Sequence, residues 1–167
     1  MSMIGQYARL APAEWERAIQ EPDWAWDFVE EHLAADPGDG TPVAGGRLHS
    51  TGKMWHALEY LLKLRGVEVN VVHGEEELPG ADDWGYGPPR TISPEQVQAA
   101  ARAMGAITPE GLVEGVAPAE LADAGIYPYS GSDPGERLDD TAIAYQDLRA
   151  FFQTTARLRQ GLLVWIA

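Results

Sequence analysis

The chain has 167 residues, and its 26 acidic side chains outnumber the 12 basic ones, which gives a formal net charge of −14. A surface of that sign repels a phosphate backbone, so the composition argues against nucleic acid as a partner. Cysteine is absent, which excludes disulfides, thiolate metal sites and thiol nucleophiles. No stretch approaches the ~20 apolar residues of a membrane helix, and the first residues lack a secretory signal pattern. We therefore expect a soluble cytoplasmic protein with one domain over residues 1–167.

The first quarter of the chain predicts one strand and two helices. Strand-favouring residues alternate over residues 3–10, and a proline at the start of each following segment suits the first turn of a helix over 12–20 and over 22–35. In the second helix His32 lies inside the apolar arc, where a histidine is usually satisfied by one backbone or carboxylate partner. The Gly- and Pro-rich stretch 36–50 predicts a loop, and its spacing fits neither a dinucleotide fingerprint nor a calcium loop.

The stretch 50–66 predicts the best-specified helix of the chain, capped by Ser50 or Thr51. Its apolar stripe consists of Met54, Trp55, Leu58, Leu61 and Leu62. On the other side, Glu59 and Lys63 form a favourable i,i+4 pair. One face of this helix is therefore expected in the core, and the polar face is free to meet something else.

The second half of the chain predicts alternating extended and helical segments. Those segments are a strand over 67–72, an acidic turn to Glu77, a loose stretch 78–87, an extended segment 86–92, a helix from Ser93 to Met104, short helices after Thr108 and Ala117, a loop 125–136, a last helix from Asp139 or Asp140 to Gln160 that Gly161 ends, and a strand 162–166. We expect the terminal strand to pair with the first one. The predicted class is α+β, a helix-rich domain with a small sheet that includes both terminal strands.

No motif indicates a metal, a cofactor or a catalytic centre. The tightest candidate ligand pair is His56 with Glu59, and a zinc site needs three or four ligands. The chain lacks a Gly-x-Ser-x-Gly elbow, a P-loop, and zincin or kinase motifs. We therefore expect no cofactor and no metal, and we lean toward a protein that is not an enzyme.

A set of polar and aromatic residues nevertheless suggests a ligand-binding groove beside the 51–65 helix. The set consists of Trp55, His56, Tyr60, Trp84, Tyr86, Arg90 and Tyr127. If the loop after the helix folds back onto it, Arg90 meets a carboxylate or phosphate and the rings pack on a flat ligand. The competing interpretation places Trp55 and Trp84 in the core, with Arg90 paired to one of the many acids.

Several segments, taken together and in this order, match one known family: Met3-Ile-Gly-Gln-Tyr7, Lys53-Met-Trp-His-Ala-Leu-Glu-Tyr-Leu-Leu62, Gly85-Tyr-Gly-Pro-Pro-Arg90 with the residues up to Val97, Ile126-Tyr-Pro128, and the stretch 151–165. On these segments the chain resembles the YfbM-like family of uncharacterised bacterial proteins. The chain departs from the family pattern at Thr51-Gly52 and over 67–77. The resemblance implies an α+β fold and implies no catalytic residues.

Size, charge and the lack of catalytic motifs favour a non-catalytic binding or protein-interaction domain, of the immunity type that neutralises a basic protein partner. The alternative is an enzyme or small-ligand binder that uses His56, Tyr86 and Arg90. A third hypothesis is a homo-oligomer formed through exposed aromatic residues. Neither nucleic acid nor a membrane is expected as a partner.

Overall fold

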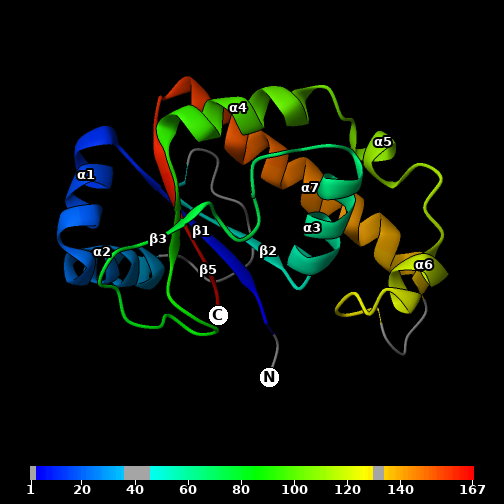
Figure 1. The fold of residues 1–167 in the computed structure, drawn as a ribbon, viewed down its shortest axis with the longest axis horizontal. Helices are drawn as coiled ribbons and strands as arrows, with labels where there is room; N and C mark the ends of the chain where they lie inside the picture. Colours follow the sequence, from blue (N-terminus) through cyan, green and yellow to red (C-terminus); the bar gives the residue numbers. More distant parts are fainter. Residues whose placement is uncertain (1–2, 36–45, 130–133) are drawn as a thin grey trace.

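The structure, a computed structural model, describes residues 3–35, 46–129 and 134–167 (Figure 1). Its strands are β1 (Gly5–Leu10), β2 (Leu48–Gly52), β3 (Glu76–Glu77), β4 (Arg90–Ile92) and β5 (Gly161–Ile166). Its helices are α1 (Pro12–Gln20), α2 (Pro22–Ala35), α3 (Trp55–Leu64), α4 (Pro94–Gly105), α5 (Pro109–Val113), α6 (Pro118–Asp123) and α7 (Pro134–Arg157). Within these ranges no helix is both long and apolar enough to cross a membrane.

The strands form one antiparallel sheet in the order β2-β1-β5-β4-β3. Strands β1 and β5 pair along their whole length, from Gly5 opposite Ile166 to Leu10 opposite Gly161. Beyond them, Ile4 and Ala167 exchange two backbone hydrogen bonds of 2.8 and 2.9 Å. The predicted pairing of the first and last strands is therefore confirmed, and so is the α+β class.

Both faces of the sheet are covered by helices, which explains the continuous apolar run of β5. Along β5, Leu162, Val164 and Ile166 face one hydrophobic cluster, whereas Leu163 and Trp165 face the other. Figure 1 shows α1 and α2 on the opposite side of the strands from α3 and α7. A strand buried on both faces has no polar side to alternate with, and every residue of β5 is buried.

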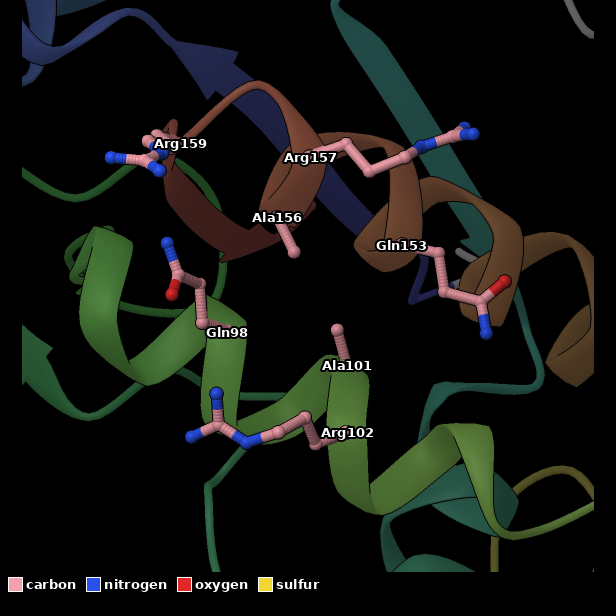
Figure 2. A pocket seen from close by; sticks show the side chains of 7 residues that line it. All are labelled: Gln98, Ala101, Arg102, Gln153, Ala156, Arg157 and Arg159. Carbon is pink, nitrogen blue, oxygen red and sulfur yellow. The ribbon is translucent and has the colours of Figure 1, made fainter.

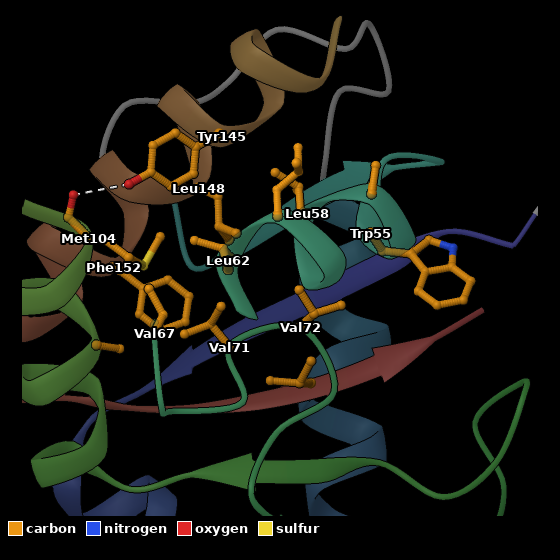
Figure 3. Packing of buried hydrophobic residues seen from close by; sticks show 14 of the residues in the cluster. Trp55, Leu58, Leu62, Val67, Val71, Val72, Met104, Tyr145, Leu148 and Phe152 are labelled. Atoms are coloured by element: carbon orange, nitrogen blue, oxygen red, sulfur yellow. Dashed lines mark hydrogen bonds between the residues drawn. The ribbon is translucent and has the colours of Figure 1, made fainter. Parts of the chain in front are cut away.

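The larger cluster packs α3 and the later helices against the sheet (Figure 3). From α3 it takes Trp55, Leu58, Leu61 and Leu62, as the apolar stripe predicts. Deep in this cluster, the hydroxyl of Tyr145 donates to the carbonyl of Met104 at 3.0 Å and lies 2.8 Å from that of Ile107. The pairing matters because a buried hydroxyl without a partner is destabilising.

The central helix is shorter than predicted because its first residues belong to the sheet. Strand β2 ends at Gly52, whose φ of +56° turns the chain toward α3, which begins at Trp55. The hydroxyls of Ser50 and Thr51 donate to the Gly5 carbonyl instead of capping the helix. The prediction of a loop over 36–50 is wrong at its end, where β2 begins at Leu48, and residues 36–45 lie outside the described residues.

The predicted strand over 67–72 is also wrong. Val67, Val71 and Val72 are buried in the larger cluster, but the backbone around them makes turns. Local hydrogen bonds of Asn70 take the place of strand pairing in this segment. The Asn70 side chain accepts from the His73 N–H at 3.1 Å, and the Asn70 N–H donates to the Glu75 carboxylate at 2.8 Å. Local side-chain hydrogen bonds of this kind compete with strand pairing.

The last helix starts earlier and ends earlier than predicted. It begins at Pro134, although residues 130–133 of the predicted loop 125–136 lie outside the described ones. It ends at Arg157, because Arg159 rather than Gly161 takes the left-handed position that closes a helix. Gly161 has another role: a Cβ atom there would overlap the ring of Trp15.

Candidate functional site

Three of the seven predicted site residues come together beside α3. The rings of Trp55 and His56 stack with centroids 5.0 Å apart, and the Tyr127 ring lies 6.2 Å from that of Trp55. The Tyr127 N–H donates to His56 Nδ1 at 2.9 Å, so in the neutral imidazole the proton sits on Nε2. Partial burial lowers the pKa of His56, which favours that neutral form. Trp55 itself is only 8% exposed and serves the core, as the competing interpretation expects.

The carboxylate of Glu59 organises this face, although the site prediction did not include it. Glu59 Oε1 lies 2.9 Å from His73 Nδ1 and 3.1 Å from Lys63 Nζ. The hydrogen bond with His73 lowers the pKa of Glu59 to about 2, against its partial burial. The predicted pair with Lys63 is confirmed. His73 has no sequence signal, since it reaches Glu59 from an irregular turn 14 residues away.

Tyr60 lies at the rim of the same face. Its hydroxyl donates to Glu120 Oε1 at 3.0 Å and so joins α3 to α6. This hydrogen bond to a carboxylate raises the pKa of Tyr60. We call His56, Glu59, Tyr60, His73 and Tyr127 the α3 face. The side chains of His56, Glu59, Tyr60 and His73 already have partners within the chain, which is the pattern of groups that hold segments together.

Trp84 and Tyr86 do not join the α3 face. Trp84 is buried in the smaller cluster, on the other side of the sheet, with ring centroids 5.0 Å from Trp26 and 5.3 Å from Trp165. Tyr86 is 54% exposed, and its N–H donates to the Ile166 carbonyl at 2.9 Å. Trp84 is therefore structural, and Tyr86 is an exposed ring at the end of the central strand.

Arg90 lies in β4 and binds the neighbouring segment of its own chain. Its Nη2 donates to the Glu75 carbonyl at 2.8 Å and its Nε to the Gly74 carbonyl at 3.3 Å. The carboxylate of Glu77 is 3.7 Å from Nη1. The guanidinium thus fixes the turn that leads into β3. Within the described ranges, no group of three or more His, Asp or Glu side chains could hold a metal ion.

A second surface, on α2, is acidic. Residues 22–35 contain four acidic side chains and no lysine or arginine, a formal charge of −4 out of −14. The exposed acids of α2 are Asp23, Asp27, Glu30 and Glu31, which we call the acidic face. Asp23, Asp27 and Glu30 recur at helical spacing and so lie on one side of α2. Half-buried tryptophans, Trp24 and Trp26, flank these acids.

Comparisons with known proteins agree with the resemblance seen in the sequence. A family described as "Domain of unknown function (DUF1877)" matches residues 1–165. The crystal structure of YfbM from Escherichia coli, a protein of unknown function, is similar at 15% identity and a TM-score of 0.68, over 98% of this chain and 99% of that one. At this identity the likeness shows the fold. No curated protein matches. Because the family match covers almost the whole length, the chain belongs to the DUF1877 family, as the YfbM-like resemblance predicts.

Proposed function

We propose that the protein is a non-catalytic binding domain that docks a basic protein partner on the acidic face of α2. The observation that carries this proposal is the stripe of exposed carboxylates on α2 beside partly exposed tryptophans. The α3 face supports it indirectly, because four of its five side chains already have a hydrogen-bond partner within the chain.

The carboxylates and the tryptophan rings of α2 indicate which kind of partner this surface would bind. Carboxylates on one side of a helix attract Lys- and Arg-rich surfaces over a Debye length and speed association. Tryptophan is enriched among the residues that supply most of the binding energy in interfaces. The Arg17 guanidinium lies 4.5 Å from the Trp24 ring centroid, so this surface already holds one cation from its own chain. Sequestration of a basic toxin, as immunity-type proteins perform it, is the biological role that fits this chemistry.

Affinity capture from a lysate of the source organism tests the proposal. The wild-type chain is expected to enrich one basic protein at low salt and to release it as the salt concentration rises, because screening weakens charge attraction. A variant that neutralises the acidic face is expected no longer to enrich this basic protein. Its substitutions are Asp23→Asn, Asp27→Asn, Glu30→Gln and Glu31→Gln.

A matched control changes the charge by the same amount elsewhere. Its four exposed positions are Glu68→Gln, Glu114→Gln, Asp123→Asn and Asp140→Asn. This control is expected to keep the partner. The proposal fails if no protein is enriched at any salt concentration, or if both variants lose it equally.

The pairing of Glu59 with His73 favours a second candidate, a small-ligand binder or enzyme at the α3 face. A carboxylate on Nδ1 fixes an imidazole so that its Nε2 faces outward as an acceptor, an arrangement that general bases use. Saturation-transfer NMR with a metabolite mixture checks it. Signals that the wild type attenuates and His73→Gln leaves unchanged would support this candidate, and identical spectra would reject it.

A further inference from the structure

A hollow of about 660 Å³ lies between α4 and the end of α7, and no predicted site residue lines it. Its volume falls in the range of small-molecule sites. In Figure 2, Ala101 of α4 and Ala156 of α7 point toward each other. Short apolar side chains at facing positions leave the space between the two helices open.

Three arginines line this hollow, namely Arg102, Arg157 and Arg159. Within the described ranges none of them lies in an ion pair with a carboxylate, and Arg157 donates only to Thr154 Oγ1, at 3.1 Å. Among the arginines whose side chains the structure describes, those that donate to a carbonyl or a carboxylate are Arg9, Arg17, Arg47, Arg65, Arg90 and Arg149. All three are exposed, so in a chain with more than twice as many acids as bases this hollow offers guanidinium groups without a carboxylate partner to an anionic ligand.

The backbone at Arg159 adds an independent observation. Arg159 has a φ of +55°, the one positive value outside glycine among the described residues. Its N–H donates to the Ala156 carbonyl and the next N–H, of Gln160, to the Thr155 carbonyl, both at 3.0 Å, which is the hydrogen-bond pattern that closes a helix. Glycine is the residue this position favours, since a Cβ atom is strained there. An arginine held in a strained conformation at a hollow points to a function for its side chain.

From these observations we infer that the hollow between α4 and α7 binds a small molecule that carries a phosphoryl group. Guanidinium groups offer paired N–H donors that match phosphoryl oxygens, and the Gln98 amide adds a neutral donor beside them. Figure 2 shows Gln98 with the guanidinium groups of Arg102 and Arg159 on one side of the alanine pair, and Arg157 on the other. The net charge of −14 disfavours a nucleic-acid polymer, so the ligand is a small phosphate compound.

Titration with two probes, inorganic pyrophosphate and ribose 5-phosphate, tests this site. Arginine Nε–Hε resonances are recorded by NMR at low salt. The resonances of Arg102 and Arg159 are expected to shift and saturate with at least one probe, and the tighter probe tells inorganic from organic phosphate. Arg102→Gln is expected to weaken binding about tenfold. The control Arg17→Gln, an arginine paired with Glu21, is expected to leave the affinity unchanged.

The variant Arg159→Gly separates binding from folding. Glycine relieves the strained backbone, so the thermal midpoint is expected to rise while the probe affinity falls about tenfold. The inference is overturned if neither probe saturates these resonances below about 10 mM, if Arg159→Gly binds as tightly as the wild type, or if sulfate binds as tightly as both probes.

Discussion

At the scale of single residues, a few buried polar groups decide how segments without regular structure are held. Glu59 is the clearest case, because one carboxylate with 16% side-chain exposure joins α3 to the turn that carries His73. The negative charge that strengthens its hydrogen bonds to His73 and Lys63 exists only in the ionised form. The stability that this contact contributes must therefore depend on pH.

We expect acid to destabilise the wild type more than Glu59→Gln. The folded pKa of Glu59, about 2, lies below its ordinary value of 4.5, so its contribution is present above pH 4.5 and is lost as the pH falls toward 2. Between pH 5 and pH 3 the wild type is expected to lose about 1 kcal/mol more unfolding free energy than the variant, after allowance for solvent screening. Urea unfolding at each pH measures this difference. Parallel pH profiles would contradict the prediction, and the exposed Glu68→Gln is the control.

Gly5 is a position where the absence of a side chain is required by packing. A Cβ atom there would overlap Thr51 Oγ1 and lie 3.0 Å from the Trp55 Cβ. We expect Gly5→Ala to destabilise the protein by about 1–3 kcal/mol through overpacking. In Gly105→Ala, the new Cβ at the end of α4 meets nothing closer than 3.9 Å, and this variant is expected to gain up to about 1 kcal/mol. Denaturant midpoints of the two variants should move in opposite directions.

At the scale of elements, the helices differ in how they begin. Helix α4 starts with a capping box, in which Ser93 Oγ accepts the Gln96 N–H at 3.2 Å and Gln96 Oε1 accepts the Ser93 N–H at 2.8 Å. The N-cap of helix α1 is Ala11, which has no side-chain acceptor, although Glu14 accepts the Ala11 N–H at 2.8 Å. Helix α1 therefore lacks the stabilisation that a side-chain acceptor at its N-cap, residue 11, would provide.

Reciprocal substitutions at these caps are expected to have opposite effects. Ser93→Ala removes the acceptor and should cost about 1 kcal/mol of unfolding free energy. Ala11→Ser supplies one to α1, where the extended backbone of residue 11 already suits a cap, and should add about 0.5–1 kcal/mol. Equilibrium urea unfolding measures both. A destabilised Ala11→Ser variant would show that packing around residue 11 outweighs the new hydrogen bond.

Local sequence signals predicted the existence of several helices and strands. The helices after Ala11 and Ser93 and both terminal strands followed from proline positions, capping residues and apolar spacing. Strand β2 and the turn at Asn70 could not be predicted, because the pairing of residues 48–50 and Gly52 with β1 and local side-chain bonds overrode the preferences of the sequence.

The candidate site was predictable only where its residues share a helix. Neighbours such as Trp55 and His56 meet on α3, whereas the partner of Glu59 lies in a turn and Trp84 lies across the sheet. The arginines of the α4–α7 hollow come from α4, from the last residue of α7 and from the turn after it. Their placement around one hollow depends on tertiary packing, which no local pattern records.

At the scale of the whole molecule, the sheet is organised around its two terminal strands. Strands β1 and β5 are inner strands, and the ends of the described chain are joined by the paired hydrogen bonds of Ile4 and Ala167. A circular permutant that links the ends by a short Gly/Ser linker and opens the chain at the exposed Gly115 is expected to unfold in one cooperative transition. A chain that stops at Gln160 is expected to show none. Thermal and urea unfolding followed by circular dichroism distinguish the two, and a cooperative transition in the shortened chain would refute this account.

The place of β5 in the sheet also sets an order of events during synthesis. Five of the six tryptophans and most of both clusters lie before residue 161, yet the strand that separates the two clusters comes last. A nascent chain therefore exposes both apolar surfaces until residues 161–166 have left the ribosome. Chaperone binding to such ribosome-bound chains should persist until that point and end soon after it, because only then can β5 pack against both hydrophobic clusters.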